Sequence, residues 1–125
     1  MADESTKERR EYSRAKVASF VIIRCELRYT ISSKQPHEFH THTENISEGG
    51  INVILEEELR CPDIVEIKLF LTGKLAPLEC NGQVVWSKLS SPASVAPPLY
   101  TTAIKFIGMG VSSREAIRKV VDCLG

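Results

Sequence analysis

Apolar and polar residues alternate with a period of two along most of this chain, and that pattern constrains the fold more than any other feature. Residues two apart on an extended strand lie on the same face, so the alternation is typical of half-buried antiparallel strands. Six short strands of this kind favour a small antiparallel barrel or sandwich. We expect the strands at Val17–Thr30, Glu38–Ile46, Gly50–Leu55, Ile64–Leu71, Leu78–Leu89 and Tyr100–Ile107.

The pattern changes at two places. Asn81-Gly82 interrupts the fifth predicted strand and indicates a turn, or a bulge at a barrel corner. After the sixth strand, apolar residues follow helical spacing, and Ser112 with Glu115 fits a capping box. We therefore expect a helix over residues 112–124, which would cover one open end of a barrel or offer a surface to a partner.

Length and composition set the class of protein. A chain of 125 residues with 42% hydrophobic and 26% charged residues is typical of one globular domain with its own core. A formal net charge of zero argues against binding to a nucleic acid polymer, which requires a basic surface. The charged N-terminus and the lack of long apolar runs predict a cytoplasmic protein without a membrane span. The four cysteines show no CxxC spacing and read as free thiols of a reducing cytosol.

A polar stretch, Asn45-Ile-Ser-Glu-Gly-Gly50, joins the second and third predicted strands. Asn45 and Ser47 are two apart, so on an extended backbone both would present hydrogen-bonding groups on one face. Gly49 and Gly50 can take positive φ and leave room for a ligand to approach the backbone. The stretch is therefore a candidate ligand shelf, although the same residue types are also the usual formers of turns.

A basic segment precedes the first predicted strand. Residues 7–16 contain five basic and two acidic side chains, which makes this segment +3 in a chain of zero net charge. The guanidinium groups of Arg10 and Arg14 could bind phosphate, pair with the O6/N7 edge of guanine or stack on a base. A solvated, charged tail is the alternative interpretation of such a segment.

Together these two motifs resemble the PilZ domain family, which is marked by RxxxR before the first strand and (D/N)xSxxG after the second. Here they read Arg10-Glu-Tyr-Ser-Arg14 and Asn45-Ile-Ser-Glu-Gly-Gly50, and the resemblance runs from about Lys7 to the C-terminal helix. It implies an all-β fold, a six-stranded antiparallel β-barrel with a C-terminal α-helix, over residues 9–125. It also implies a flexible RxxxR segment at 9–16, while the polar composition of residues 1–8 predicts a disordered tail.

The resemblance also implies a bacterial receptor for the second messenger cyclic di-GMP. In that role Arg10 and Arg14 hold phosphates and guanine edges, and Asn45 hydrogen-bonds a guanine or steadies the arginine segment without the charge of an aspartate. Ser47 meets phosphate and Gly50 allows close approach, with Gly49 as an extra glycine. Arg9 directly precedes the motif, and family members with arginine there often bind two intercalated ligand molecules. Ligand would draw the basic segment across the strand face and so signal to a downstream protein partner.

Other functions remain open at this stage. A protein of the same fold could act as an interaction adaptor in pilus or flagellar function without binding nucleotide. His40 and His42 share a predicted strand face with Glu44 and could present ligands to a metal, although such histidines are usually solvated surface. Trp86 is expected in the core or at a barrel end, with base stacking as the less favoured role. No catalytic arrangement is identifiable, so we expect neither an enzyme nor a bound cofactor or metal.

Overall fold

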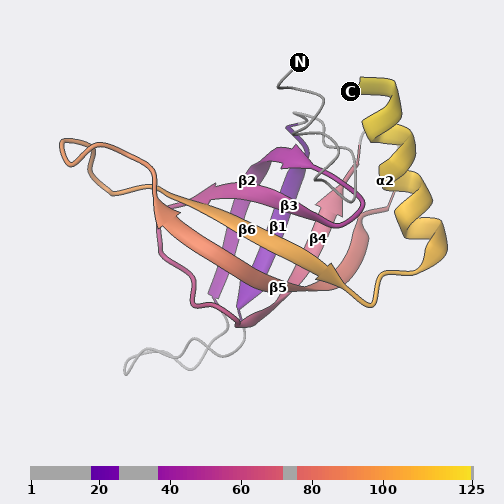
Figure 1. Ribbon diagram of the computed structural model, residues 1–125, viewed down its shortest axis with the longest axis horizontal. Coiled ribbons are helices and arrows are strands. Elements are labelled where there is room, and N and C mark those ends of the chain that lie inside the picture. Colours follow the sequence, from indigo (N-terminus) through magenta and orange to yellow (C-terminus); the bar gives the residue numbers. More distant parts are fainter. Residues whose placement is uncertain (1–17, 26–36, 72–75, 125) are drawn as a thin grey trace, which may run out of the picture.

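The fold is a closed antiparallel barrel with one helix at its end, as Figure 1 shows for a computed structural model that describes residues 18–25, 37–71 and 76–124. The strands pair in the order β1-β2-β3-β6-β5-β4, and β4 pairs with β1 to close the barrel. This confirms the predicted fold class. The elements are β1 (Phe20–Cys25), β2 (His37–Ile46), β3 (Gly50–Leu55), β4 (Ile64–Phe70), β5 (Leu78–Leu89), β6 (Tyr100–Ile107) and α2 (Val111–Leu124).

The interior of the barrel is filled by the apolar residues that the alternation assigned to inward faces. On β4, for example, Val65, Ile67 and Leu69 are buried while the residues between them are exposed. The same alternation buries every second residue of β1 and β3. Residues 26–30 of the longer first strand that we predicted lie outside the described part of the chain.

Replacing Ile67 with alanine is expected to lower the free energy of unfolding by about 2–5 kcal/mol, since this side chain is 1% exposed and its loss leaves a cavity. Ile64 lies on the same strand but is 46% exposed, so Ile64→Ala is a matched control with an expected cost of about 0.5 kcal/mol. Urea denaturation of the two variants measures the difference. Equal losses would contradict the assignment of the two faces of β4.

The helix α2 packs against one end of the barrel, beside the turn between β2 and β3 (Figure 1). Its residues Ile117 and Val121 are buried in the common core together with Met109, as the apolar spacing predicted. The Arg114 N–H donates to the Gly110 carbonyl at 3.1 Å, so the helix begins at Val111. Ser112 therefore lies inside the first turn, and the predicted cap at Ser112 is wrong.

The strand β5 runs without interruption through Asn81 and Gly82, so the predicted turn or bulge at this pair is wrong. Gly82 is buried inside the barrel, where an added Cβ would lie 2.5 Å from Ile104 Cγ2 and 2.6 Å from Ile67 Cδ1. The glycine makes room for these two core side chains. The irregularity of β5 lies further along, between Val84 and Trp86.

Candidate functional site

A β-bulge in β2 turns Asn45 to the outside of the barrel. The pairing of β2 with β3 shifts between Thr43 and Asn45, while Thr43 before the shift and Ile46 after it are both buried. Inward positions therefore change from odd to even residue numbers at this bulge. Asn45 lies opposite Asn52, and both amide side chains are half-buried on the outer face. Bulges commonly redirect side chains next to functional sites.

A second bulge, in β5, turns Trp86 to the same outer face. The pairing of β5 with β6 shifts between Val84, which is buried, and Trp86, which pairs with Ala103. Directly paired residues share a face, and Ala103 points outward because its neighbours Thr102 and Ile104 are buried. Trp86 is thus half-buried on the outer surface, in the middle of the β5–β6 pairing, so the predicted place in the core or at a barrel end is wrong.

The two bulges bring four residues into one line across four strands, which we call the outer row: Asn45, Asn52, Ala103 and Trp86. Three strand spacings give the row a length of about 14 Å. It has two amides at one end, an indole at the other, and only a methyl group at Ala103 between them. This arrangement suits a flat ligand that hydrogen-bonds at one end and stacks at the other.

Two lysines flank the outer row on the same face. Lys88 follows Trp86 by two residues on β5, and its Nζ lies 5.2 Å from the centre of the indole ring. Lys105 follows Ala103 by two residues on β6 and pairs with Gly50 and Gln83. Beyond the row, Trp86 and Lys88 line a cavity of about 640 Å³ whose other charged residues are Arg60 and Glu58, a net charge of +1. The electrostatic character of this region therefore favours an anionic ligand.

Ser19, directly before β1, lies beside one end of the outer row. The Thr43 N–H donates to the Ser19 carbonyl at 2.9 Å, and the Ser19 N–H donates to Thr43 Oγ1 at 3.0 Å. Ser19 thus lies beside the β2 bulge, where its partner Thr43 is two residues before Asn45. Arg14 is five residues before Ser19, a reach of up to about 17 Å. Arg9, Arg10 and Arg14 lie outside the described residues, so their contact with the row stays a prediction.

Ser47 and its neighbours form the turn between β2 and β3. The Gly49 N–H donates to Ser47 Oγ at 3.2 Å, and the Ser47 N–H donates to the Gly50 carbonyl at 2.9 Å. The Ser47 hydroxyl also lies 3.4 Å from that carbonyl, a long and weak contact that a better acceptor could replace. Ser47 therefore stabilises the turn, while its contact with phosphate remains a prediction.

Gly50 has a structural role in the packing of the barrel. A Cβ at this position would collide with the carbonyl oxygen of Ile104 on β6 and lie 3.1 Å from the carbonyl carbon. The missing side chain thus lets β3 approach β6, which the ligand argument from the sequence did not foresee. The described residues include one glycine with positive φ, Gly108 at 64°, so Gly49 and Gly50 do not adopt the positive φ that glycine allows.

Glu48, inside the same turn, contacts the C-terminal helix. The Nε of Arg118 donates to Glu48 Oε1 at 2.7 Å, and this hydrogen bond raises the pKa of the Arg118 guanidinium. The two residues are 70 positions apart, and the turn pattern carries no signal for a partner at that distance. Sequence analysis therefore missed this contact.

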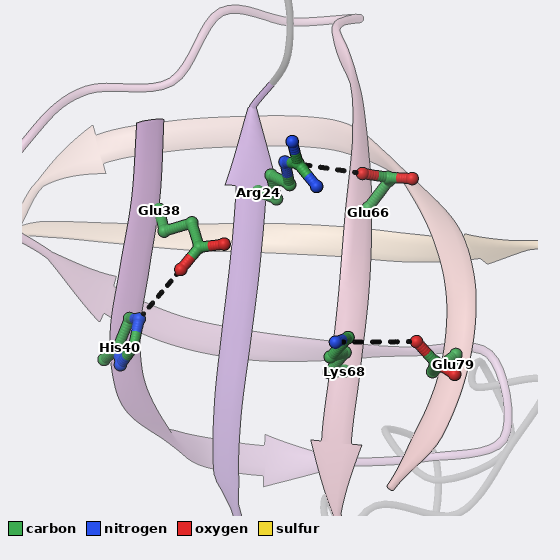
Figure 2. Close-up of polar contacts among 6 residues, drawn as sticks. All are labelled: Arg24, Glu38, His40, Glu66, Lys68 and Glu79. Atoms are coloured by element: carbon green, nitrogen blue, oxygen red, sulfur yellow. Dashed lines mark hydrogen bonds and ion pairs between the residues drawn. The ribbon is translucent and has the colours of Figure 1, made fainter. Parts of the chain in front are cut away.

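A second outer face, formed by β1, β2, β4 and β5, carries three pairs of polar side chains (Figure 2). A cavity of about 680 Å³ lies on the same face. Its charged groups are largely paired across strands, with Arg24 3.9 Å from Glu66 and Lys68 3.8 Å from Glu79. The cavity lining holds two basic and three acidic side chains, a net charge of −1, which suits an anionic ligand less well than the outer row. Burial also raises the pKa of Cys80 there to about 11, so its thiol stays protonated and is a poor nucleophile.

His40 and His42 of β2 lie on this second face. The Phe20 ring contacts those of His40 and His42 at centroid distances of 6.1 and 5.5 Å, and His40 hydrogen-bonds Glu38 at 3.1 Å. Over residues 18–25, 37–71 and 76–124, no group of three or more His, Cys, Asp or Glu side chains could hold a metal ion. Nor does that part of the chain contain a helix long and apolar enough to cross a membrane. Cys25, Cys61 and Cys80 are free thiols, as predicted.

Comparison with solved structures finds the same barrel in several bacterial proteins. The inhibitor of motility MotI/DgrA of Bacillus subtilis superposes with a TM-score of 0.69 at 19% identity, over 92% of this chain and 50% of that one. The PilZ domain of YcgR from Escherichia coli, solved with c-di-GMP, superposes with a TM-score of 0.64 at 12% identity, over 93% of this chain and 91% of that one. The MrkH–c-di-GMP complex of K. pneumonia superposes with a TM-score of 0.61 at 13% identity, over 92% of this chain and 52% of that one.

This chain spans about half the length of the MotI and MrkH chains and corresponds to nearly all of the YcgR domain. A comparison with curated protein sequences finds no match. The model of the PilZ domain family matches residues 8–122, which include both motifs, all six strands and most of α2. The chain therefore belongs to the PilZ domain family.

Proposed function

We propose that this protein is a receptor for cyclic di-GMP and that it binds the ligand on the outer row. The observation that carries the proposal is the alignment of Asn45 and Asn52 with Trp86 across four strands, next to the point where the basic segment joins the barrel. Membership of the PilZ family supports it, as do the structural neighbours that were solved with c-di-GMP.

The chemistry of the row matches the parts of this ligand. A guanine base can stack on the indole of Trp86, and the amides of Asn45 and Asn52 can donate to and accept from the edges of a guanine. Lys88 and Lys105, which flank the row, complement the two phosphates. This role is binding and needs no bound cofactor, metal ion or catalytic group.

The basic segment would complete the site from the N-terminal side. Arg10 and Arg14 supply guanidinium groups that bind phosphate or the guanine edge, and ordering of the segment over the row costs conformational entropy. The row is long enough for more than one base, and Arg9 provides a further planar cation that can stack. A pair of intercalated ligand molecules is therefore the binding mode that we propose. The ordered segment would then present a changed surface to a downstream protein partner.

Replacing Trp86 with alanine is expected to weaken binding of cyclic di-GMP by about 1–3 kcal/mol, because one base loses its stacking surface. Trp86→Phe keeps an aromatic ring and should retain most of the affinity. Since Trp86 is half-buried on the outer face, both variants should fold, and circular dichroism checks this. Unchanged affinity in Trp86→Ala would place the ligand away from the indole end of the row.

Calorimetric titration of the purified protein with cyclic di-GMP tests the proposed function, with GTP and cyclic GMP as controls. The proposal predicts saturable binding of the cyclic dinucleotide at micromolar or lower concentration, with two ligands per chain. A stoichiometry of one would overturn the two-molecule mode alone. No heat and no shift of the thermal midpoint would overturn the receptor assignment.

One observation favours the second candidate, an adaptor of PilZ type that binds no nucleotide. Ser47 stabilises the β2–β3 turn and Gly50 lets β3 approach β6, so both motif residues have roles in a protein without ligand. An adaptor would keep them for stability alone. It would not need the stacking surface of Trp86 or the paired arginines, so the binding experiments separate the two candidates.

A further inference from the structure

One ion pair joins the ligand motif to the C-terminal helix. Arg118 of α2 holds Glu48 of the β2–β3 turn through an Nε–Oε1 hydrogen bond of 2.7 Å. The Arg118 side chain is 58% exposed but the Glu48 side chain only 15%, whereas both partners of the cross-strand pairs Arg24–Glu66 and Lys68–Glu79 are at least 44% exposed. Exposed ion pairs contribute little, but a mostly buried carboxylate that loses its partner is costly.

The turn that contains Glu48 is held from one other direction. The Phe106 N–H on β6 donates to the Gly49 carbonyl at 2.9 Å, which fixes the side of the turn that faces the barrel. Arg118 fixes the Glu48 side. The position of Arg118 is set in turn by its neighbours Ile117 and Val121, which anchor α2 in the core. The geometry of the turn therefore depends on how α2 is seated.

The Glu48–Arg118 contact affects ligand binding through the charge of the Glu48 carboxylate. Glu48 lies between Ser47 and Gly49, so its carboxylate is the negative group within the motif that would receive an anionic ligand. Without a cation beside it, this carboxylate would repel a phosphate at short range. The hydrogen bond from Arg118 both neutralises the carboxylate and holds it against the helix.

We propose that Arg118 is a positioning residue for the ligand site and that the Glu48–Arg118 pair couples occupancy of that site to the seating of α2. This inference rests on the proposed function and adds a named route from the motif to the helix. Coupling between two equilibria is reciprocal. If the pair strengthens ligand binding by some factor, bound ligand holds α2 against the turn more tightly by the same factor.

The test is a double-mutant cycle read by titration with cyclic di-GMP. Arg118→Ala should weaken binding about tenfold, the scale of one lost hydrogen bond to a charged group. Arg118→Lys should restore part of the affinity, because it keeps the positive charge. In a Glu48→Gln background, Arg118→Ala should have little further effect. Lys119→Ala removes an equal charge from an exposed position of the same helix and should leave binding unchanged.

A second readout is amide hydrogen exchange, measured first without ligand and then with it. Hydrogen exchange of the turn amides at Ser47 and Gly49 should be faster in Arg118→Ala than in wild type, and unchanged in Lys119→Ala. In wild type, saturating cyclic di-GMP should slow amide exchange in α2, and this effect should be lost in Arg118→Ala.

The outcomes separate the two proposals. Wild type that fails to bind cyclic di-GMP overturns the proposed function, and the coupling to a ligand with it. Wild type that binds while Arg118→Ala binds equally well overturns the positioning role alone. Unchanged amide exchange in the turn of ligand-free Arg118→Ala also overturns that role, whatever the titration shows.

Discussion

Replacing Gly50 with alanine is expected to lower the free energy of unfolding by about 2–3 kcal/mol. The added Cβ would collide with the backbone carbonyl of Ile104, and a paired backbone cannot move aside as the end of a flexible side chain can. Overpacking typically costs about 1–3 kcal/mol and occasionally more, and a collision with paired backbone lies at or above the upper end of that range. Alanine also lowers the conformational entropy of the unfolded chain, which by itself would raise the free energy of unfolding by about 0.4–1 kcal/mol. The cost of the collision must exceed this gain for the variant to be destabilised.

Denaturation in urea with Gly110→Ala as the control measures this effect. A Cβ at Gly110 would meet no atom within 4 Å. Gly110 directly precedes α2, where alanine caps a helix less well than glycine, so the free energy of unfolding of the control should fall by at most about 1 kcal/mol. If Gly50→Ala is as stable as wild type, the close approach of β3 to β6 is not as described. If it is stable but fails to bind cyclic di-GMP, Gly50 serves the ligand directly, as the family motif implied.

Replacing Arg14 or Arg10 with alanine is expected to weaken binding of cyclic di-GMP by about 2–5 kcal/mol each, at least about 30-fold in the dissociation constant. Each guanidinium would pair with a phosphate or a guanine edge that is covered when the segment closes over the outer row. Loss of one partner leaves the other group desolvated and unpaired. The short distance along the chain from Arg14 to Ser19, which lies beside Thr43, allows this contact.

Arg60→Ala is the matched control for the two arginine variants. Arg60 is exposed, lies outside both motifs and lines the cavity beyond Trp86, so its loss removes the same charge at the margin of the site. It should weaken binding by about 0.2–1 kcal/mol at most. Full affinity in both Arg10→Ala and Arg14→Ala would show that the RxxxR segment does not hold the ligand.

The strands and their inward faces could be predicted because burial in a barrel imposes a period of two on the sequence. Ile51, Val53 and Leu55 face the core of β3 as that period required, and the single helix was placed to within one residue at its start. The resemblance carried by the two motifs predicted the fold class, and the residue types of the second motif indicated the turn that contains Ser47.

The periodicity that predicts the strands does not place the two bulges, because a bulge is set by pairing with a neighbouring strand. In β2 the sequence does hold a signal: its two large apolar residues, Phe39 and Ile46, are seven positions apart, so a regular strand could not turn both toward the core. In β5 the run Val84-Val85-Trp86 is apolar on both faces, so its period cannot show which residue turns outward. For this reason the sequence predicts Trp86 in the core or at a barrel end.

Contacts between distant segments were the other part that the sequence could not reveal. The pairing of Glu48 with Arg118 and the clash that excludes a side chain at Gly50 both depend on how elements meet in the closed barrel. Gly50 was recognised as special from its motif, but its physical reason is the backbone of β6. The local pattern identifies such a residue, and tertiary packing determines its role.

Fluorescence titration with cyclic di-GMP tests the central claim most directly, because Trp86 is the single tryptophan of the chain and lies at one end of the outer row. Stacking of a guanine on the indole should produce a saturable change in emission that follows the calorimetric binding curve and is lost in Arg14→Ala. Binding by calorimetry without any change in emission would contradict the placement of the ligand on this row. The absence of both signals would contradict the receptor function itself.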